Sequence, residues 1–332
     1  MKTRPIASRR LKLRQLEILL AVADARSMAK AAARLAISQP GISRAVADME
    51  HTLGVPLFDR STQGVEPTQY GRALLRRGIA AFDEIDQGVK DVEFLADPTA
   101  GELRIGGGAG LSEEIILPVI HRLSHQYPRV VFQIAHHQGM TLFEQLRERN
   151  IEIGLLRASG LAREEDIAFE KLFEEPLVVV AGVDSPWSRR RNIKLLELVN
   201  ERWTWPPPGS FFDTLVVDAF RAVGLTPPQP TVYTHAFSFR LSLAATGSFL
   251  AVVPAAIMTM PNKYPLIRVL PVELPTTHRE VGIVTLKKRT LGPLAQKFIE
   301  SVREIANPLA KDERFNRPRR NSSRAATREH QS

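Results

Sequence analysis

The chain contains no cysteine among its 332 residues. This absence excludes disulfide bonds, thiol redox sensing and metal sites with thiolate ligands. Long apolar runs are also missing, because the most apolar stretch, 249–260, is too short to span a bilayer and is interrupted by Pro254. The first 14 residues are basic but lack the apolar segment of a signal peptide. We therefore expect a cytoplasmic protein with no membrane partner.

Patterns typical of catalysis are missing as well. The His, Asp and Ser residues lack the spacing of a catalytic triad, and no segment matches a phosphate-binding P-loop. We expect a protein that is not an enzyme and that needs neither a cofactor nor a metal. An enzyme or transport protein with an added DNA-binding domain is the alternative, and it would require substrate turnover or a signal peptide.

Positive charge is confined to the two ends of the chain. The net charge is +9 overall, with +8 in residues 1–77 and +4 in residues 311–332, which leaves −3 for the middle. Segregated positive charge attracts phosphates and supplies the salt-dependent part of DNA affinity. A purely architectural nucleic-acid protein could use both ends, but the large middle segment disfavours it.

Residues 31–44 predict two short helices joined by a tight turn. Ile37 would fill the turn, Ser38 is a good N-cap, and Pro40 falls in the first helical turn, where its missing N–H costs nothing. Apolar residues then recur with the spacing of one buried helical stripe, at Ile42, Val46, Met49 and Leu53.

The opposite face of this second helix is small, polar and basic. A helix that buries one side and offers short hydrogen-bonding side chains on the other suits the major groove of double-stranded DNA. Some of these residues also start the helix, and both roles can hold together. We expect DNA contacts from Ser38, Gln39, Pro40, Ser43 and Arg44.

Residues 54–68 change character and predict a β-hairpin wing. Short strands are expected at Leu57-Phe58 and at Val65, with the turn at residues 62–64. Arg60 and Gln63 would project from the hairpin toward phosphates or the minor groove.

Thr68 is expected to cap a long helix that ends near Ala96. Its apolar stripe has no obvious cover within the N-terminal segment, so we expect it to pair with the same helix of a second copy. Packing on the C-terminal domain of the same chain is the alternative. The seam would contain Leu75, Ile79, Phe82, Ile85 and Val89.

Beyond residue 97 strands alternate with helices, which predicts an α/β domain with parallel sheets. Strands are expected at 102–106, 130–135, 151–156, 176–181, 231–234, 250–253, 267–270 and 279–286, and helices at 114–126, 141–148, 212–223, 238–246 and 292–306. Two such halves, joined by crossings near Val180 and Leu266, would enclose a cleft. The basic tail has no apolar periodicity and is expected to be disordered. The predicted domains are 1–67, 68–96, 97–306 and 307–332.

These residues resemble the LysR-type transcriptional regulators. The resemblance covers residues 11–305 and is most specific in Ala32-Ala-Ala-Arg-Leu35, Ser38-Gln-Pro40, Leu53-Gly54, Leu57-Phe58 and Thr68–Gly71. It implies a winged helix-turn-helix, a dimerising linker helix and a two-lobed α/β effector domain shaped like a periplasmic binding protein. It also implies a dimer or tetramer that binds an interrupted inverted repeat. The sugar- and aromatic-responsive members look most similar.

The chain departs from the family pattern at two informative places. Gly41 stands where the family usually has Ala, which weakens the start of the recognition helix. Phe211-Phe212-Asp213 begins a helix near which Arg is common in the family. The aromatic pair with an acid suggests an effector that is not held by Arg.

A small-molecule effector is expected at the loops that follow the strands, where open α/β sheets bind ligands. The glycine-rich turn at 106–112 offers backbone N–H groups, although it could equally be a tight turn without a ligand. Glu113 and Glu114 in the next helical turn would repel a strongly anionic ligand. The neighbouring residues His136 and His137 would point to opposite sides of a strand, which disfavours a metal ion shared between them. We expect a neutral or singly charged, hydroxyl-bearing effector held by Gly108, Ala109, Ser112, His137, Gln138, Thr141, Ser210, Phe211, Phe237 and Ser238.

Overall fold

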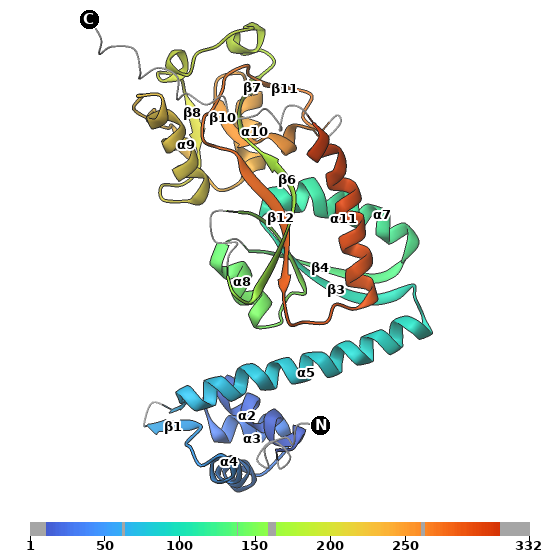
Figure 1. Cartoon of the computed structure of the whole chain (residues 1–332). Coiled ribbons are helices and arrows are strands. Elements are labelled where there is room, and N and C mark those ends of the chain that lie inside the picture. Colours follow the sequence, from blue (N-terminus) through green and yellow to red (C-terminus); the bar gives the residue numbers. More distant parts are fainter. Residues whose placement is uncertain (1–10, 62–63, 138, 159–163, 260–262, 313–332) are drawn as a thin grey trace, which may run out of the picture. The chain divides into compact units, whose positions relative to one another are not determined.

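A computed structural model describes residues 11–312 except 62–63, 138, 159–163 and 260–262. The chain divides into two compact units, residues 1–92 and 93–332 (Figure 1). Within the described ranges, no helix has the length and apolar character needed to cross a membrane.

The first unit is built from short helices followed by a hairpin. Its elements are α2 (Leu13–Ala25), α3 (Met28–Leu35), α4 (Gln39–Leu53), β1 (Phe58–Ser61), β2 (Gly64–Pro67) and most of α5 (Gln69–Ala96). The predicted hairpin is confirmed, since β1 and β2 pair antiparallel. The predicted cap is confirmed too, because the Gly71 backbone N–H donates to Thr68 Oγ1 at 3.0 Å. A Cβ at Gly71 would collide with the Leu57 carbonyl oxygen, so only glycine lets α5 start so close to the wing.

The core of the first unit lies where the apolar stripe predicted it. Ile42, Val46 and Met49 of α4 are fully buried against Leu19 and Val22 of α2. Leu53, the last residue of the stripe, is half-buried and packs against the same core.

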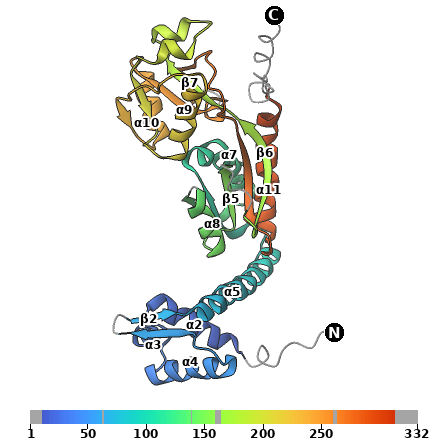
Figure 2. The same ribbon diagram turned by 60° about the vertical axis from the view of Figure 1, so that its left-hand side comes forward.

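The second unit contains two sheets, each with its own helices (Figure 2). We call the first lobe 1. Its sheet has the strand order β4-β3-β5-β12-β6. Lobe 1 contains β3 (Ala100–Gly107), α6 (Ala109–Leu111), the π-turn η1 (Ser112–Ile116), α7 (Leu117–Gln126), β4 (Arg129–His136), α8 (Gly139–Arg147), β5 (Ile153–Arg157), β6 (Ile167–Glu175), β12 (Arg279–Leu286) and α11 (Pro293–Lys311).

Lobe 2 has the strand order β11-β7-β10-β8-β9. It contains β7 (Leu177–Gly182), η3 (Pro186–Arg189), η4 (Leu195–Leu198), β8 (Trp203–Trp205), α9 (Phe211–Ala222), β9 (Val232–Tyr233), α10 (Phe237–Ala245), β10 (Leu250–Pro254), η5 (Ala255–Thr259) and β11 (Ile267–Val269). The aromatic rings of Trp203, Trp205 and Phe220 meet in its core, with centroids 5.6–6.0 Å apart.

The sheets differ from the expectation in direction and in where the chain crosses. They are mixed rather than parallel, because β12 runs antiparallel to β5 and β6, and β7 runs antiparallel to β10 and β11. The chain leaves lobe 1 at Pro176, between β6 and β7, and returns between β11 and β12. The predicted crossings near Val180 and Leu266 were therefore wrong, since Val180 lies inside β7 and Leu266 directly precedes β11.

Several elements differ from the sequence prediction. β6 and β8 were not predicted, because β6 has a charged pattern and β8 has only three residues. The helix expected at 114–126 begins instead at Ala109 and passes through the π-turn η1. The last helix runs to Lys311, five residues beyond the expected end, and includes Pro308.

Candidate DNA-contacting and effector sites

The turn between α3 and α4 presents the N-terminus of α4 to solvent. Ala36 closes α3 in the left-handed conformation, with φ of 53°, and Ser38 Oγ accepts the Gly41 backbone N–H at 3.3 Å. Among the predicted DNA-contacting residues of this helix, Ser43 is half-buried and the others are exposed. The structure thus places Ser38, Gln39, Pro40, Ser43 and Arg44 together at one end of the helix, and their contact with DNA stays a prediction.

The wing is held to α4 by a residue that sequence reasoning missed. Glu50 Oε1 accepts the backbone N–H groups of Leu57, at 2.7 Å, and Phe58, at 3.3 Å. These two hydrogen bonds connect α4 to the start of β1, on which Arg60 is exposed. The only sequence signal for this role of Glu50 was a carboxylate on α4 a few residues before a turn whose backbone N–H groups need an acceptor. Gln63 lies outside the described residues.

The apolar residues of the predicted seam on α5 become more exposed to solvent along the helix. Leu75 packs partly against the core of the first unit, and Ile79 lines a groove with Leu20 of α2 and Leu35 of α3. Exposure then rises along the helix, from 44% at Ile85 to 66% at Val92 and 79% at Leu95. The start of the stripe therefore belongs to the chain's own core, and the later part is free for a partner.

On lobe 1 the two predicted loops lie side by side. Ser112 Oγ donates to the Gly108 carbonyl oxygen at 3.2 Å and lies 3.5 Å from His136 Nδ1. The His137 backbone N–H donates to the Gly107 carbonyl oxygen at 3.2 Å, and His137 is half-buried. Thr141 is exposed on α8. The Ala109 side chain and Gln138 fall outside the described positions.

On lobe 2 the predicted residues gather around three phenylalanine rings. Ser210 caps α9 by accepting the Asp213 backbone N–H at 3.3 Å. The Phe212 ring centroid lies 5.2 Å from that of Phe211 and 5.3 Å from that of Phe237 at the start of α10. Ser238 is exposed beside them. The starts of α9 and α10 therefore share one aromatic cluster.

The two lobes meet at this cluster. A Cβ placed on Gly110 would lie 3.3 Å from Phe237 Cε2 and 3.4 Å from Arg157 Nη1. Arg157 Cζ also lies 5.8 Å from the centroid of the Phe212 ring, within cation–π range. The structure thus joins the glycine-rich turn of lobe 1 to the aromatic cluster of lobe 2.

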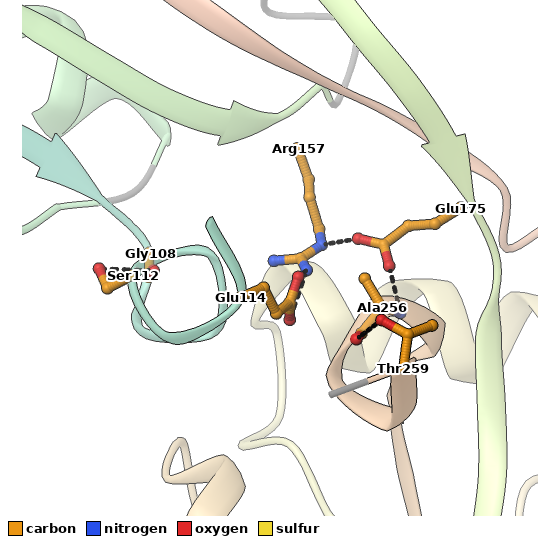
Figure 3. Close-up of polar contacts among 7 residues, drawn as sticks. All are labelled: Gly108, Ser112, Glu114, Arg157, Glu175, Ala256 and Thr259. Atoms are coloured by element: carbon orange, nitrogen blue, oxygen red, sulfur yellow. Dashed lines mark hydrogen bonds and ion pairs between the residues drawn. The ribbon is translucent and has the colours of Figure 1, made fainter. Parts of the chain in front are cut away.

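Arg157 lies between two buried carboxylates (Figure 3). Its Nη2 donates to both oxygens of Glu114, at 3.0 and 2.7 Å, and its Nε donates to Glu175 Oε1 at 2.6 Å. The Ala256 backbone N–H of η5 donates to Glu175 Oε2 at 2.9 Å. The side chain of Arg157 is 6% exposed and those of both glutamates are 1% exposed. We call Glu114, Arg157 and Glu175 the buried triad.

Burial and mutual charge interactions shift the pKa values of Glu114 and Arg157 in this triad. Burial raises the pKa of Glu114 to about 8, the Arg157 cation opposes this rise, and the Glu175 anion adds to it. Burial favours a lower pKa for Arg157, but the two carboxylates outweigh it and raise that pKa. Glu114 was expected to repel anionic ligands from the first helical turn. The structure corrects this, because the side chain is buried and bound to Arg157.

A second buried guanidinium contacts the aromatic cluster. Arg240 of α10 is 1% exposed, donates to the Val252 carbonyl at 2.8 Å and stacks 4.4 Å from the centroid of Phe237. Burial lowers its pKa to about 10, so it remains charged at neutral pH. The prediction of an effector that is not held by Arg stays a prediction, although Arg157 and Arg240 both lie within cation–π range of the aromatic rings. The available signal for Arg157 was its position directly after the apolar strand 153–156.

Comparisons with known proteins agree with this architecture. Residues 13–72 match the model of the bacterial regulatory helix-turn-helix proteins of the lysR family, and residues 96–307 match the LysR substrate binding domain. The uncharacterised HTH-type regulator YybE of Bacillus subtilis is 30% identical over 291 residues, covering 87% of this chain and 97% of that protein.

Solved structures are similar over nearly the whole chain. A full-length OxyR variant from Pseudomonas aeruginosa has a TM-score of 0.63 at 22% identity, over 90% of this chain and 95% of that one. Full-length CbnR complexed with its target DNA has a TM-score of 0.50 at 25% identity, over 89% and 100%. With both of its units matched by the family's own models, the chain belongs to the LysR-type transcriptional regulators, which bind DNA and carry an effector-binding domain.

Proposed function

We propose that α4 enters the major groove of DNA and that Gln39 and Arg44 contact base edges there. The exposed polar face at the start of α4, opposite a fully buried stripe, is the observation that carries this proposal. Gln can form two hydrogen bonds with adenine, since its amide oxygen accepts from N6 and its amide NH2 donates to N7, and Arg can donate two hydrogen bonds to O6 and N7 of guanine. The likeness to CbnR, which was solved in complex with its target DNA, supports DNA binding by this chain. Two copies would read an interrupted inverted repeat, one half-site each.

The experiment selects bound duplexes from a random DNA pool with the full-length protein. Gln39→Ala should relax the preference at one position of each half-site and cost about 1–3 kcal/mol of binding free energy on the selected duplex. His51→Ala, on the exposed far end of the same helix, is the matched control and should select the same sequence. If Gln39→Ala selects the wild-type site with unchanged affinity, Gln39 does not contact a base edge and the proposed DNA-contacting face of α4 is wrong.

We also propose that copies associate through the exposed part of α5. Ile85 and Val89 continue the apolar stripe of α5 beyond Phe82, and a buried subunit contact would remove them from water. Phe82→Asp with Ile85→Asp places unpaired charges in the seam and should abolish the dimer in sedimentation. A double variant that stays dimeric would show that α5 is not the contact. Contacts between effector domains would build a tetramer.

The effector is proposed to bind where the glycine-rich turn of lobe 1 faces the aromatic cluster of lobe 2. The polar groups there are Ser112, Ser210 and His137, and the rings of Phe211 and Phe237 supply an apolar wall. Arg157 adds no net positive charge, because two carboxylates surround it. A neutral or singly charged, hydroxyl-bearing ring compound, such as a sugar or an aromatic acid, fits better than a dicarboxylate or a phosphate.

Thermal-shift screening of the full-length protein against sugars, aromatic acids and dicarboxylates tests this assignment. A stabilising compound should lose its effect in Ser112→Ala and in Phe211→Ala, while both variants keep their affinity for the selected duplex. Ser124→Ala, an exposed serine on α7, is the control and should respond fully. Normal responses in both cleft variants would place the effector elsewhere.

The protein would act in the cytoplasm, where its DNA target lies. Its DNA-binding domain would comprise residues 1–67, its linker helix 68–96 and its effector domain 97–311, because α11 continues to Lys311 and packs on lobe 1, and the basic tail would follow.

A further inference from the structure

The buried triad carries an unbalanced charge. Glu114 and Glu175 are both anionic when deprotonated, and Arg157 supplies one positive charge. A net negative charge on side chains buried this deeply costs folding free energy, because solvent water does not reach them. One proton on either carboxyl group would bring the triad to neutrality.

The hydrogen bonds indicate which carboxyl group takes the proton. Glu175 accepts one bond from Arg157 Nε and a second from the Ala256 backbone N–H, so both of its oxygens are held by separate donors. Both oxygens of Glu114 share a single donor atom, Arg157 Nη2. Donors stabilise the charged form of a carboxylate. Glu114 is therefore the more readily protonated of the two.

The other charged groups around Glu114 do not replace it in this role. Arg157 comes from β5, Glu175 from β6, and Glu113 from the same π-turn. Glu113 is bound by Lys263 Nζ at 2.6 Å, and Tyr264 Oη lies 3.5 Å from it. Burial raises the pKa of Tyr264, and the hydrogen bond to Glu113 raises the pKa of Lys263 against the effect of burial. Both groups therefore titrate above the range in which Glu114 titrates.

The triad lies where the lobes touch. Glu114 belongs to the π-turn after the glycine-rich turn, and such turns often occur at functional positions. Arg157 faces Phe212 of lobe 2, and Glu175 directly precedes the crossing at Pro176 and binds η5, which follows a strand of lobe 2. A change in charge here acts on contacts between the lobes.

We propose that Glu114 is a proton-binding site whose occupancy sets the contact between lobes 1 and 2. With the proton bound, the triad is neutral and the lobes stay in contact. Proton release leaves a buried net negative charge, and water must enter to solvate it, so the contact loosens. The protein thereby responds to pH as a second input, separate from the proposed organic effector and from the proposed DNA contacts.

The experiment measures the distance between the lobes as a function of pH. The chain has no cysteine, so Ser124→Cys on α7 and Ala222→Cys on α9 provide unique dye positions, both exposed. Labelled chains are mixed with an excess of unlabelled full-length protein, so that energy transfer reports within one subunit. We expect transfer to change between pH 7 and 9 in the otherwise wild-type protein, and to stay at its low-pH value throughout in Glu114→Gln.

Two further variants identify the group. Glu113→Gln removes the neighbouring half-buried carboxylate, whose charge contributes least to the raised pKa of Glu114, and should keep the transition with a midpoint only slightly lower. Glu175→Gln removes the like charge beside Glu114 and should move the midpoint to lower pH. An unchanged distance across pH 7–9 in the wild type, or the same transition in Glu114→Gln, would overturn the proposal.

Thermal unfolding supplies an independent reading. Because the pKa of Glu114 is raised on folding, its stabilising effect is complete below the ordinary glutamate pKa of 4.5 and is lost as pH rises through about 8. The melting temperature of the wild type relative to Glu114→Gln should therefore fall by about 4 °C or more between pH 6 and pH 9. A constant difference would count against proton binding at Glu114 even if the lobes move.

Discussion

The two units of this chain place their charged side chains in opposite ways. In the described part of the first unit the buried polar residues, Thr68 and Gln87, are uncharged, whereas the second unit buries Glu114, Glu152, Glu175, Arg240 and Arg289. Surface charge in the first unit can attract phosphate at little cost to stability. Buried charge in the second unit must be paired or protonated, so that unit should respond most strongly to pH and to single substitutions.

The largest effect is expected from Arg157→Met. This change leaves Glu114 and Glu175 buried without a cation and should cost the second unit about 3–5 kcal/mol. Urea unfolding followed by tryptophan fluorescence isolates this unit, because Trp187, Trp203 and Trp205 all lie in it.

Lys171→Met is the matched control for Arg157→Met. Lys171 is half exposed and pairs with Glu280 at 2.8 Å, so its loss should cost less than about 1 kcal/mol. Equal costs for the two variants would remove the contrast between buried and surface charge.

A smaller but still large effect is expected from Ile42→Ala in the first unit. The side chain is fully buried in an apolar core, and a cavity there should cost about 3 kcal/mol. The helical signal of the first unit and its DNA binding should be lost at lower urea, while the tryptophan transition stays in place. A tryptophan midpoint that moves by the same amount would show that the units unfold together.

Helix caps allow the same perturbation in each unit. Ser38→Ala removes the cap of α4, and Ser210→Ala removes the cap of α9. Each should cost about 1 kcal/mol, the first in the circular dichroism phase of the first unit and the second in the tryptophan transition. Effects that appear in the opposite signal would contradict the assignment of the two transitions.

The smallest effect on stability is expected from Arg60→Ala. Arg60 is exposed on the wing, so unfolding should be unchanged, whereas DNA affinity should fall for all sequences and the salt slope should decrease by about 1. Arg221→Ala, exposed on α9 in the second unit, should leave both quantities unchanged. An unchanged salt slope in Arg60→Ala would remove the wing from the DNA contact.

The sequence alone determined the elements whose causes are local. Ser38, Thr68 and the stripe Ile42, Val46 and Met49 act within a few residues of themselves, so caps and periodicity predicted the helices and the wing that the structure contains. The exposed face of α4 followed directly from its buried one. Strand order and direction were beyond such signals, because pairing joins segments far apart, as β12 does with β5 and β6.

Only the tertiary structure decided what surrounds the proposed effector site. Arg157 is 43 residues from Glu114 and 18 from Glu175, and no local pattern marks three charged residues as partners. In the sequence Glu114 has the appearance of a solvated acid at a helix start. Folding removes it from water and sets it against one cation and one anion, and that burial, which depends on the packing of whole strands, gives the carboxyl group its raised pKa.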